Sequence, residues 1–344
     1  MIGCGSWSNE AHLPALTANE NAEVVAVVDP VAEARELAAR RFGIGRTYAS
    51  HEELFAEQEP DAVIVATPHS QHVAPARAAL DAGAHLLVEK PLALAPADAR
   101  ALQRLALERG RELIVGYPWH YNRQSSELRD LIAAGRLGRL EFVSCLFASM
   151  VRAYYRGDTE AYQPEFKLAR APRSETYSDP SLSGGGQGQT QVTHSAALLL
   201  WLTGLRPRRI SAFCETFDLA VDLVDAAAVA FDGGAVGSIS STGGRPSGHE
   251  DLLHLHLCGT EGIATYEVME GRVTLYLAGG VREELEPLPP VERYPHWGPA
   301  NNLVDVVLGR GENRSPAELG CVVVEFLDAM YRSAAANGSA VILD

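Results

Sequence analysis

The chain lacks every long apolar run: no stretch reaches the roughly 18 residues that a membrane-spanning helix needs. It also lacks internal repeats, low-complexity segments and a secretory leader pattern. Basic residues are in short supply, with 29 Lys and Arg against 44 Asp and Glu and a net charge of −15. Nucleic acids and anionic membranes bind basic surfaces, so neither is expected as a partner. We expect a small-molecule ligand instead.

Cysteine is scarce and scattered, with five residues in the chain: Cys4, Cys145, Cys214, Cys258 and Cys321. No Cys-x-x-Cys pair and no zinc-like spacing occurs, so the sequence predicts neither a metal site nor a redox motif. Isolated cysteines are typical of reduced packing residues, and we expect a cytoplasmic protein.

The 344 residues, 47% of them hydrophobic, are enough for two domains with cores of their own. In the first third, continuous apolar runs alternate with helical stretches. Such runs indicate parallel strands that are covered by helices on both faces. We therefore predict an α/β Rossmann domain, a doubly wound parallel sheet, over residues 1–118. Its strands are expected at residues 24–28, 61–66, 85–89 and 113–116.

The pattern changes after residue 118. A helix at 126–134, a strand at 140–150 and a helix at 189–202 precede a series of strands. These are expected at 208–216, 225–231, 236–241, 252–258, 263–268 and 273–276. Consecutive strands with tight turns predict an α+β domain over 119–344 with a large open, mainly antiparallel sheet.

Two further expectations concern the contacts of the second domain with the first domain and with other copies of the chain. Its closing helix, near 316–335, is expected to pack back on the first domain. An uncovered sheet face would leave an apolar patch, so we expect a homodimer or homotetramer that assembles through this sheet.

A glycine-rich turn opens the chain as Gly3-x-Gly5-x-x-Ser8. In dinucleotide-binding folds the first glycine allows a tight turn, the second lets the backbone approach the pyrophosphate, and the third position needs a small residue. We expect Gly3, Gly5, Ser6 and Trp7 to contact a cofactor. Only two residues precede Gly3, so we also expect the native start to lie upstream and to lengthen the first strand.

Asp29 follows the second apolar run, 24 residues after Gly5. A carboxylate at this place accepts hydrogen bonds from the adenosine ribose and repels a 2′-phosphate. No arginine follows it directly, so NAD is favoured over NADP as the cofactor.

Two motifs follow the next strands, at the sheet edge where ligands bind in open α/β sheets. Thr67 and Pro68 are expected to line the nicotinamide ribose pocket together with His72, although a structural histidine at a helix start is equally compatible with the pattern. Glu89 and Lys90 end the strand at 85–89, and we expect both at the cofactor. A lysine after a buried run favours an active-site role over a solvated strand end or an ion pair.

The motifs taken together resemble the Gfo/Idh/MocA oxidoreductase family, which includes glucose–fructose oxidoreductase and inositol dehydrogenase. The resemblance covers the whole chain. It is carried by Gly3-x-Gly5, Asp29, Thr67-Pro68-x-x-x-His72, Glu89-Lys90-Pro91-Leu92, Gly184-Gly185-Gly186, His194, Trp201-Leu202-x-Gly204, Gly259-Thr260-Glu261-Gly262 and Glu318-Leu319-Gly320.

The resemblance implies an NAD(P)-dependent dehydrogenase or reductase. Hydride would pass between a carbinol carbon of a sugar, sugar derivative or cyclitol and nicotinamide C4. Lys90 would hydrogen-bond the reacting oxygen, and His194 would exchange the hydroxyl proton. A buried histidine that faces the sheet is the alternative for His194.

One position departs from the family, which often has an aspartate four residues before this histidine. Thr190 stands there, and a hydroxyl cannot stabilise an imidazolium as a carboxylate does. Either Lys90 carries more of the acid/base work, or another acid replaces the aspartate, with Asp179 as the candidate. The departure keeps two alternatives open: an NAD-dependent glycosidase or lyase that oxidises its sugar transiently, and a non-enzymatic NAD-binding sensor.

Further substrate contacts are expected from aromatic and polar residues in the second domain. Together with Asp179 and Thr190, these are Trp119, His120, Tyr121, Tyr177 and His296.

Overall fold

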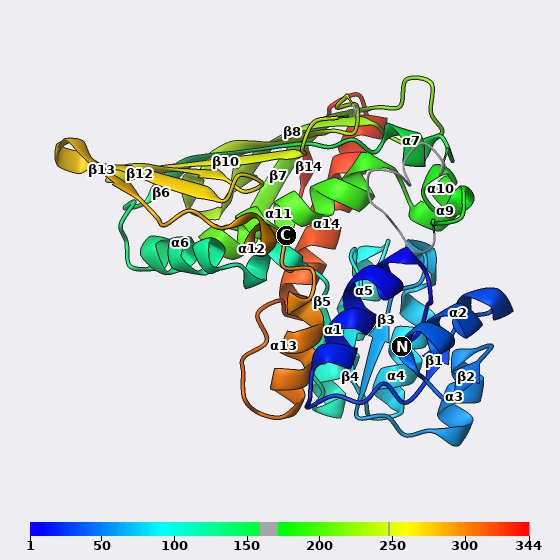
Figure 1. The fold of residues 1–344 in the computed structure, drawn as a ribbon. Helices are drawn as coiled ribbons and strands as arrows, with labels where there is room; N and C mark the ends of the chain where they lie inside the picture. Colours follow the sequence, from blue (N-terminus) through cyan, green and yellow to red (C-terminus); the bar gives the residue numbers. More distant parts are fainter. Residues whose placement is uncertain (159–170, 247, 344) are drawn as a thin grey trace.

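The computed structural model describes residues 1–158, 171–246 and 248–343. A parallel sheet built from the N-terminal third lies below a much larger sheet built from the rest of the chain (Figure 1). Helices fill the space between the two sheets. The predicted fold class is confirmed, with a Rossmann-like α/β part followed by an α+β part.

The N-terminal part alternates short strands and helices, as the apolar runs predict. Its strands are β1 (Val27–Val28), β2 (Thr47–Tyr48), β3 (Ala62–Val65), β4 (His85–Val88) and β5 (Leu113–Val115). Its helical segments are the π-helical turn η1 (Ser8–His12), α1 (Leu13–Ala18), α2 (Ala32–Phe42), α3 (His51–Glu57), η2 (His69–Gln71), α4 (Val73–Asp81) and α5 (Pro96–Arg109).

Ile2 joins the two halves of this parallel sheet. It forms parallel bridges with Val28 of β1 on one side and with Val65 of β3 on the other. The sheet order is therefore β2-β1-Ile2-β3-β4-β5. The strand predicted at 24–28 is too long, because only Val27–Val28 pair with β2. A strand needs a hydrogen-bonded neighbour, and β2 begins at Thr47.

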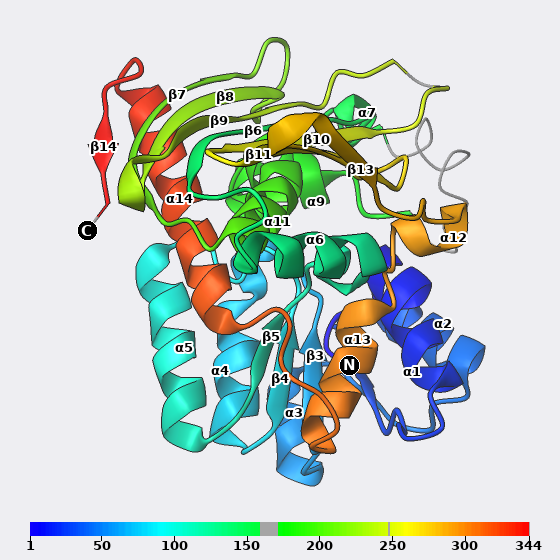
Figure 2. The same ribbon diagram turned by 90° about the vertical axis from the view of Figure 1, so that its left-hand side faces the viewer.

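Helices cover both faces of the parallel sheet (Figure 2). Helices α4 and α5 pack on one face, and α1 packs with α13 (Gly298–Val307) on the other. Helix α13 comes from the end of the chain, yet its Ala300 and Leu303 share a buried cluster with Ile64, Leu87 and Ile114. The N-terminal sheet is thus completed by a segment nearly two hundred residues away.

The remaining strands form one nine-stranded sheet of order β13-β12-β11-β10-β6-β9-β8-β7-β14. All its neighbours are antiparallel except β6 and β9. Its strands are β6 (Leu140–Ala148), β7 (Pro207–Glu215), β8 (Val224–Phe231), β9 (Val236–Thr242), β10 (Leu252–Gly259), β11 (Gly262–Glu267), β12 (Arg272–Leu277), β13 (Val281–Glu284) and β14 (Val341–Ile342). The six strands predicted after residue 204 are confirmed, and β13 and β14 were not predicted.

The helical segments of this second part gather on one side of the large sheet (Figure 1). They are η3 (Pro118–Tyr121), α6 (Arg123–Ala133), α7 (Arg152–Tyr155), α9 (Glu175–Ser178), α10 (Pro180–Ser183), the π-helical turn η4 (Gly188–Val192), α11 (Thr193–Thr203), α12 (Pro290–Arg293) and α14 (Ala317–Ala335). Two short 3₁₀ segments, η5 (Asp232–Gly234) and η6 (Ala278–Gly280), are instead the turns between β8 and β9 and between β12 and β13. Helix α14 contacts both β7 of the large sheet and α5 of the N-terminal part.

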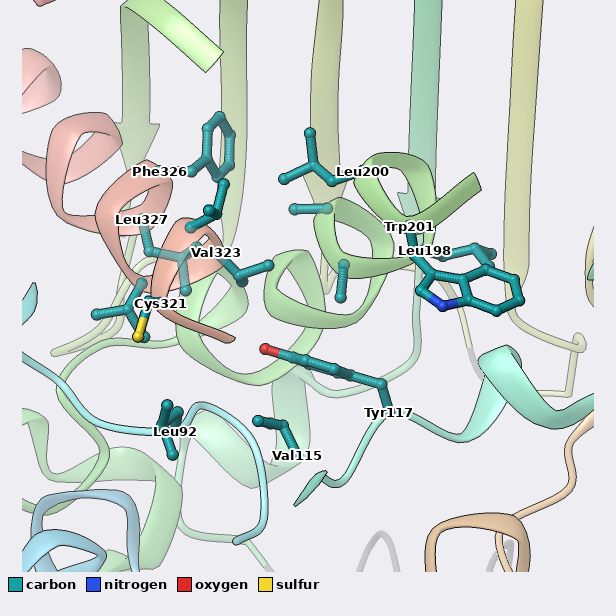
Figure 3. Packing of buried hydrophobic residues seen from close by; sticks show 14 of the residues in the cluster. Leu92, Val115, Tyr117, Leu198, Leu200, Trp201, Cys321, Val323, Phe326 and Leu327 are labelled. Atoms are coloured by element: carbon teal, nitrogen blue, oxygen red, sulfur yellow. The ribbon is translucent and has the colours of Figure 1, made fainter. Parts of the chain in front are cut away.

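Figure 3 shows the core where the two parts meet. Tyr117, which follows β5, points towards α11 and α14, where Leu198 and Val323 lie. All three are fully or almost fully buried, as are Leu92 and Val115 below them. Burial of such side chains stabilises the fold by about 1.5–3 kcal/mol each, so this junction is a packed core. Among the described residues, no helix is long and apolar enough to cross a membrane.

Candidate active site

The first glycine turn lies between β1 and β3, with Gly3 against the backbone. Gly3 has φ +91°, and a Cβ added there would stand 2.4 Å from the carbonyl oxygen of Ala66. Only glycine fits this approach. Gly5 is exposed, with no atom within 4 Å of the place of its Cβ. The turn is therefore tight on its protein side and open where it leads into the helix.

The open side of this turn fits a dinucleotide. The backbone N–H groups at Ser6 and Trp7 begin a helical segment, and the first N–H groups of a helix have no acceptor within it. Such groups bind phosphate oxygens, and Gly5 lets a pyrophosphate come close. Asp29 lies beside the turn, where its Oδ2 accepts a hydrogen bond from Cys4 N at 2.9 Å. Together, Gly3, Gly5, Ser6, Trp7 and Asp29 would hold NAD.

At the end of β3, Thr67 and His72 belong to one hydrogen-bonded loop. The Thr67 hydroxyl donates to Gln71 O at 3.0 Å. His72 is fully buried, with Nδ1 2.8 Å from Pro91 O and Nε2 3.0 Å from Thr67 O. Both ring nitrogens therefore contact carbonyls, and His72 fastens the loop after β3 to the loop after β4. Thr67 and Pro68 lie just after the carboxyl end of β3, and their contact with the cofactor stays a prediction.

Glu89 joins three parts of the site through its carboxylate. Oε1 accepts hydrogen bonds from Trp7 Nε1 at 2.9 Å and lies 2.8 Å from His12 Nε2, while Oε2 accepts from Lys90 N at 3.2 Å. Burial alone would raise the pKa of Glu89, but the hydrogen bond and charge of His12 outweigh it and the pKa is lowered. Glu89 is thus an anion whose oxygens are occupied. The fully buried His12 was not predicted.

Lys90 reaches from the end of β4 to the other half of the molecule. Its Nζ donates a hydrogen bond to the backbone oxygen of Thr190 at 3.1 Å, and the Lys90–Pro91 peptide bond is cis. Burial lowers the pKa of Lys90, while the charge of Glu89 opposes this shift. A lowered pKa makes the ammonium a better proton donor than that of an exposed lysine.

His194 stands at the start of α11 with its ring 5.5 Å from that of Trp119 and 6.3 Å from that of Tyr117. Burial, followed by the charge of Lys90, lowers the pKa of His194 well below its usual value. Its Nδ1 is buried without a hydrogen-bond partner among the described residues. The imidazole is therefore neutral, and its Nδ1 is available for a hydrogen bond.

His69 is a site residue that the sequence analysis missed. Its Nδ1 donates to Ser183 O at 2.8 Å, which leaves Nε2 as the acceptor in the neutral ring. Burial and the charge of Lys90 lower the pKa of His69, and His69 in turn lowers that of His194. Its ring lies 6.1 Å from that of Tyr177. A histidine one residue after Thr67-Pro68 was the only available signal.

The predicted substrate residues do not all gather at this place. Trp119 contacts His194 and Tyr294, with ring centroids 5.5 and 5.2 Å apart. His120 instead stacks on Trp201 at 4.7 Å, and burial lowers its pKa to about 3. The Tyr121 hydroxyl donates to Asn302. These three residues lie in a 3₁₀ turn, where successive side chains point about 120° apart, so only one of them faces the site.

Asp179 is engaged elsewhere than at the histidine. Its carboxylate caps α10, accepting a hydrogen bond from Ser181 N at 2.8 Å. Thr190 instead contacts Tyr155 and Gly186 O through its hydroxyl. His296 lies beside the first glycine turn, its ring 6.3 Å from that of Trp7. The sequence singles out Tyr155 only as a candidate for a substrate lid or a surface loop, and it does not indicate the contact with Thr190, which lies 35 residues away.

Comparisons with known proteins point to one family. Residues 1–117 match the description "Oxidoreductase family, NAD-binding Rossmann fold", and residues 125–265 match "GFO/IDH/MocA C-terminal domain". The chain is 36% identical to 1,5-anhydro-D-fructose reductase of Ensifer adhaerens over 40% of this chain and 41% of that protein. It is 32% identical to dTDP-3,4-didehydro-2,6-dideoxy-alpha-D-glucose 3-reductase of Streptomyces violaceoruber over 46% and 48%. These matches span less than half the length of the curated relatives.

A solved structure resembles the chain over its full length. GenD2 from gentamicin A biosynthesis, crystallised in complex with NAD, is 26% identical with a TM-score of 0.80, covering 100% of this chain and 95% of that chain.

Proposed function

The chain belongs to the Gfo/Idh/MocA oxidoreductase family, and from that premise we propose that it is an NAD-dependent dehydrogenase or reductase of sugars, sugar derivatives or cyclitols. The observation that carries the proposal is that Lys90 donates to the backbone oxygen of Thr190, four residues before His194, and that its charge lowers the pKa of His194. The relatives named for sugar reductases and the NAD-bound neighbour support it.

Each residue has a separate task in this proposal. NAD, when bound, supplies the hydride acceptor or donor at nicotinamide C4. Lys90 donates a hydrogen bond to the reacting oxygen and lowers the cost of its developing charge. The neutral His194 accepts the hydroxyl proton in oxidation and returns it in reduction. Trp119 provides an apolar wall beside His194 that excludes water from the reacting carbon.

A substrate screen tests the proposal. The protein is mixed with NAD and a panel of aldoses, methyl glycosides and inositols, and NADH absorbance is followed. We expect turnover with at least one polyol. Lys90→Met and His194→Gln should each reduce kcat by about 10²–10⁴-fold, while their NAD affinity stays near that of the wild type.

The same assay separates the alternatives. Product formation without net NADH release would replace the dehydrogenase by a cycle of transient oxidation. NAD and polyol binding without any product would replace it by a sensor. Full activity of both Lys90→Met and His194→Gln would refute the roles proposed for these residues.

We also propose that the chain assembles with a second copy through the uncovered face of the large sheet. Large apolar side chains are exposed there on five strands: Phe142 and Leu146 on β6, Phe213 on β7, Val236 on β9, Ile263 on β11 and Tyr276 on β12. Helices α6, α11 and α14 occupy the other face, and no helix of the described residues covers this one. Light scattering should give at least a dimer for the wild type and a smaller assembly for Leu146→Asp, with Leu107→Asp as an exposed control on α5.

A further inference from the structure

The Lys90 ammonium depends on a backbone oxygen for its orientation. Among the described residues its one hydrogen-bond acceptor is Thr190 O, at 3.1 Å. A lysine side chain has four rotatable bonds, so a single contact fixes it only if the acceptor is itself fixed. What holds Thr190 therefore decides where the ammonium lies.

The Thr190 side chain is held by a buried polar network. Its hydroxyl lies 2.9 Å from Gly186 O and also contacts the Tyr155 hydroxyl, and either hydroxyl can be the donor in that second contact. Tyr155 also lies 3.0 Å from Gln187 Oε1, and Gln187 Nε2 donates to Ser241 Oγ at 2.6 Å. Thr190 and Tyr155 are 4% and 2% exposed, so water does not compete for these bonds.

The other end of the network is fixed by a carboxylate. Asp222 accepts hydrogen bonds from Gly186 N and Gly188 N, each at 2.7 Å. These bonds fix Gly186, whose carbonyl oxygen lies 2.9 Å from the Thr190 hydroxyl. Thr190 is thus held through Gly186 on one side and through Tyr155 on the other.

We infer that Tyr155 is a positioning residue for Lys90, because its hydroxyl holds Thr190 and the Thr190 carbonyl then orients the ammonium. The inference rests on the proposed function only for the role of Lys90 in turnover. The network is uncharged at Tyr155, Gln187 and Thr190, so it directs Lys90 without adding an anion.

The charged and titratable groups around Lys90 are few. Glu89 is the neighbouring anion, and its charge raises the pKa of Lys90. The imidazoles of His69, His72 and His194 face it from the other elements, and the charge of Lys90 lowers the pKa of each. A hydrogen bond to the charged form also raises the pKa of an amine, so loss of the Thr190 contact should lower that of Lys90.

The composition makes this shift directly measurable, because Lys90 and Lys167 are the only lysines in the chain. Protein labelled with ¹³C,¹⁵N-lysine gives two side-chain signals, and Lys167→Arg identifies that of Lys90. Following this signal against pH reads the pKa of Lys90 without any substrate. We expect Tyr155→Phe and Thr190→Val to lower this pKa by at least about 0.5 unit.

Matched variants separate the hydroxyl network from general disruption. Thr190→Ser keeps the hydroxyl and should restore the pKa of Lys90 to within about 0.2 unit of the wild type. Tyr48→Phe removes another largely buried phenol, bonded to Glu57 at 3.0 Å on the far side of the N-terminal part, and should have no effect. If Tyr155→Phe does not fold, the Val and Ser variants of Thr190 carry the test.

Steady-state kinetics provide a second test of the inference. Tyr155→Phe should lower kcat by about tenfold, with a smaller change in the KM of the polyol, because orientation is lost rather than binding. A shifted pKa in a protein that turns over no polyol would refute the proposed function and leave the inference standing. An unchanged pKa in Tyr155→Phe and Thr190→Val, or an equal shift in Thr190→Ser, would overturn the inference.

Discussion

The chain contains two glycine-rich turns that are similar in sequence but differ in how closely the rest of the protein packs against them. Each leads through a π-helical turn into a helix: residues 3–5 into η1 and α1, and residues 184–188 into η4 and α11. At Gly5 the space beside the backbone is open. At Gly186 and Gly188 it is filled, since an added Cβ would stand 2.0 Å from Asp222 O and 2.3 Å from the Tyr331 hydroxyl.

The difference teaches that glycine content alone does not identify a ligand site. In the first turn the missing side chain leaves room for a ligand. In the second turn it lets the protein pack against itself, and this packing presents Thr190 and His194 to Lys90. π-Helical turns are frequent at functional sites, and here both turns place site residues. Substitutions in or beside each turn test this difference.

The largest effect is expected at Asp222, which anchors the second turn. Asp222→Ala leaves Gly186 N, Gly188 N and the Tyr331 hydroxyl without their acceptor. Buried donors without partners should lower the free energy of unfolding by about 3–5 kcal/mol, as read from urea denaturation. A loss below about 1 kcal/mol would show that the second turn does not depend on this carboxylate.

Replacing one glycine by alanine in each turn should have the second largest effect. Gly186→Ala should lower the free energy of unfolding by about 2–4 kcal/mol, because its Cβ would collide with backbone. Gly5→Ala should leave stability within about 0.5 kcal/mol but weaken NAD binding at least about tenfold, or about 1.4 kcal/mol. Denaturation measures the stability of both variants, and calorimetric titration measures their NAD affinity. A large loss of stability in Gly5→Ala and none in Gly186→Ala would contradict the assignment of the two turns.

Asp29 should show a selective effect on the cofactor. Its carboxylate accepts hydrogen bonds from Cys4 N and Val31 N, so it also shapes the first turn. Asp29→Ala should reduce the preference for NAD over NADP by about tenfold, since the charge that repels a 2′-phosphate is gone. Dissociation constants of both cofactors provide the measurement. A wild-type preference for NADP would contradict the assignment.

The smallest effect concerns Asp225, a buried acid beside the second turn. Burial, with help from Asp222, raises the pKa of Asp225 well above its usual value. The folded state therefore binds this proton more tightly than the unfolded state, and stability falls as pH rises above about 4. Asp225→Asn cannot ionise and should be more stable than the wild type by at least about 1 kcal/mol near pH 8.

Denaturation of the Asp225→Asn protein across pH supplies the control. The stability difference from the wild type should shrink towards zero near about pH 4, where the unfolded chain also holds its proton. A difference that stays constant with pH would mean that Asp225 is ionised in the folded protein.

The sequence predicted those parts of the molecule whose physics is local. Apolar runs and tight turns predicted most strands of both sheets, but not β2, β13 and β14. The motifs at strand ends indicated Lys90 and the glycine turn. His12, His69 and the contact of Tyr155 with Thr190 escaped prediction because the partners lie 77, 114 and 35 residues away. His120 was misplaced because a short 3₁₀ turn sends neighbouring residues in different directions, which no periodicity in four residues reveals.

The late return of α13 to the parallel sheet also bears on how the chain acquires its structure. During synthesis, Ile64, Leu87 and Ile114 emerge long before Ala300 and Leu303, with which they form one buried cluster. One face of the nucleotide-binding sheet must therefore stay open until about nine tenths of the chain has left the ribosome. A fragment ending at residue 118 should expose that face and aggregate, whereas co-expression with the rest of the chain should rescue it.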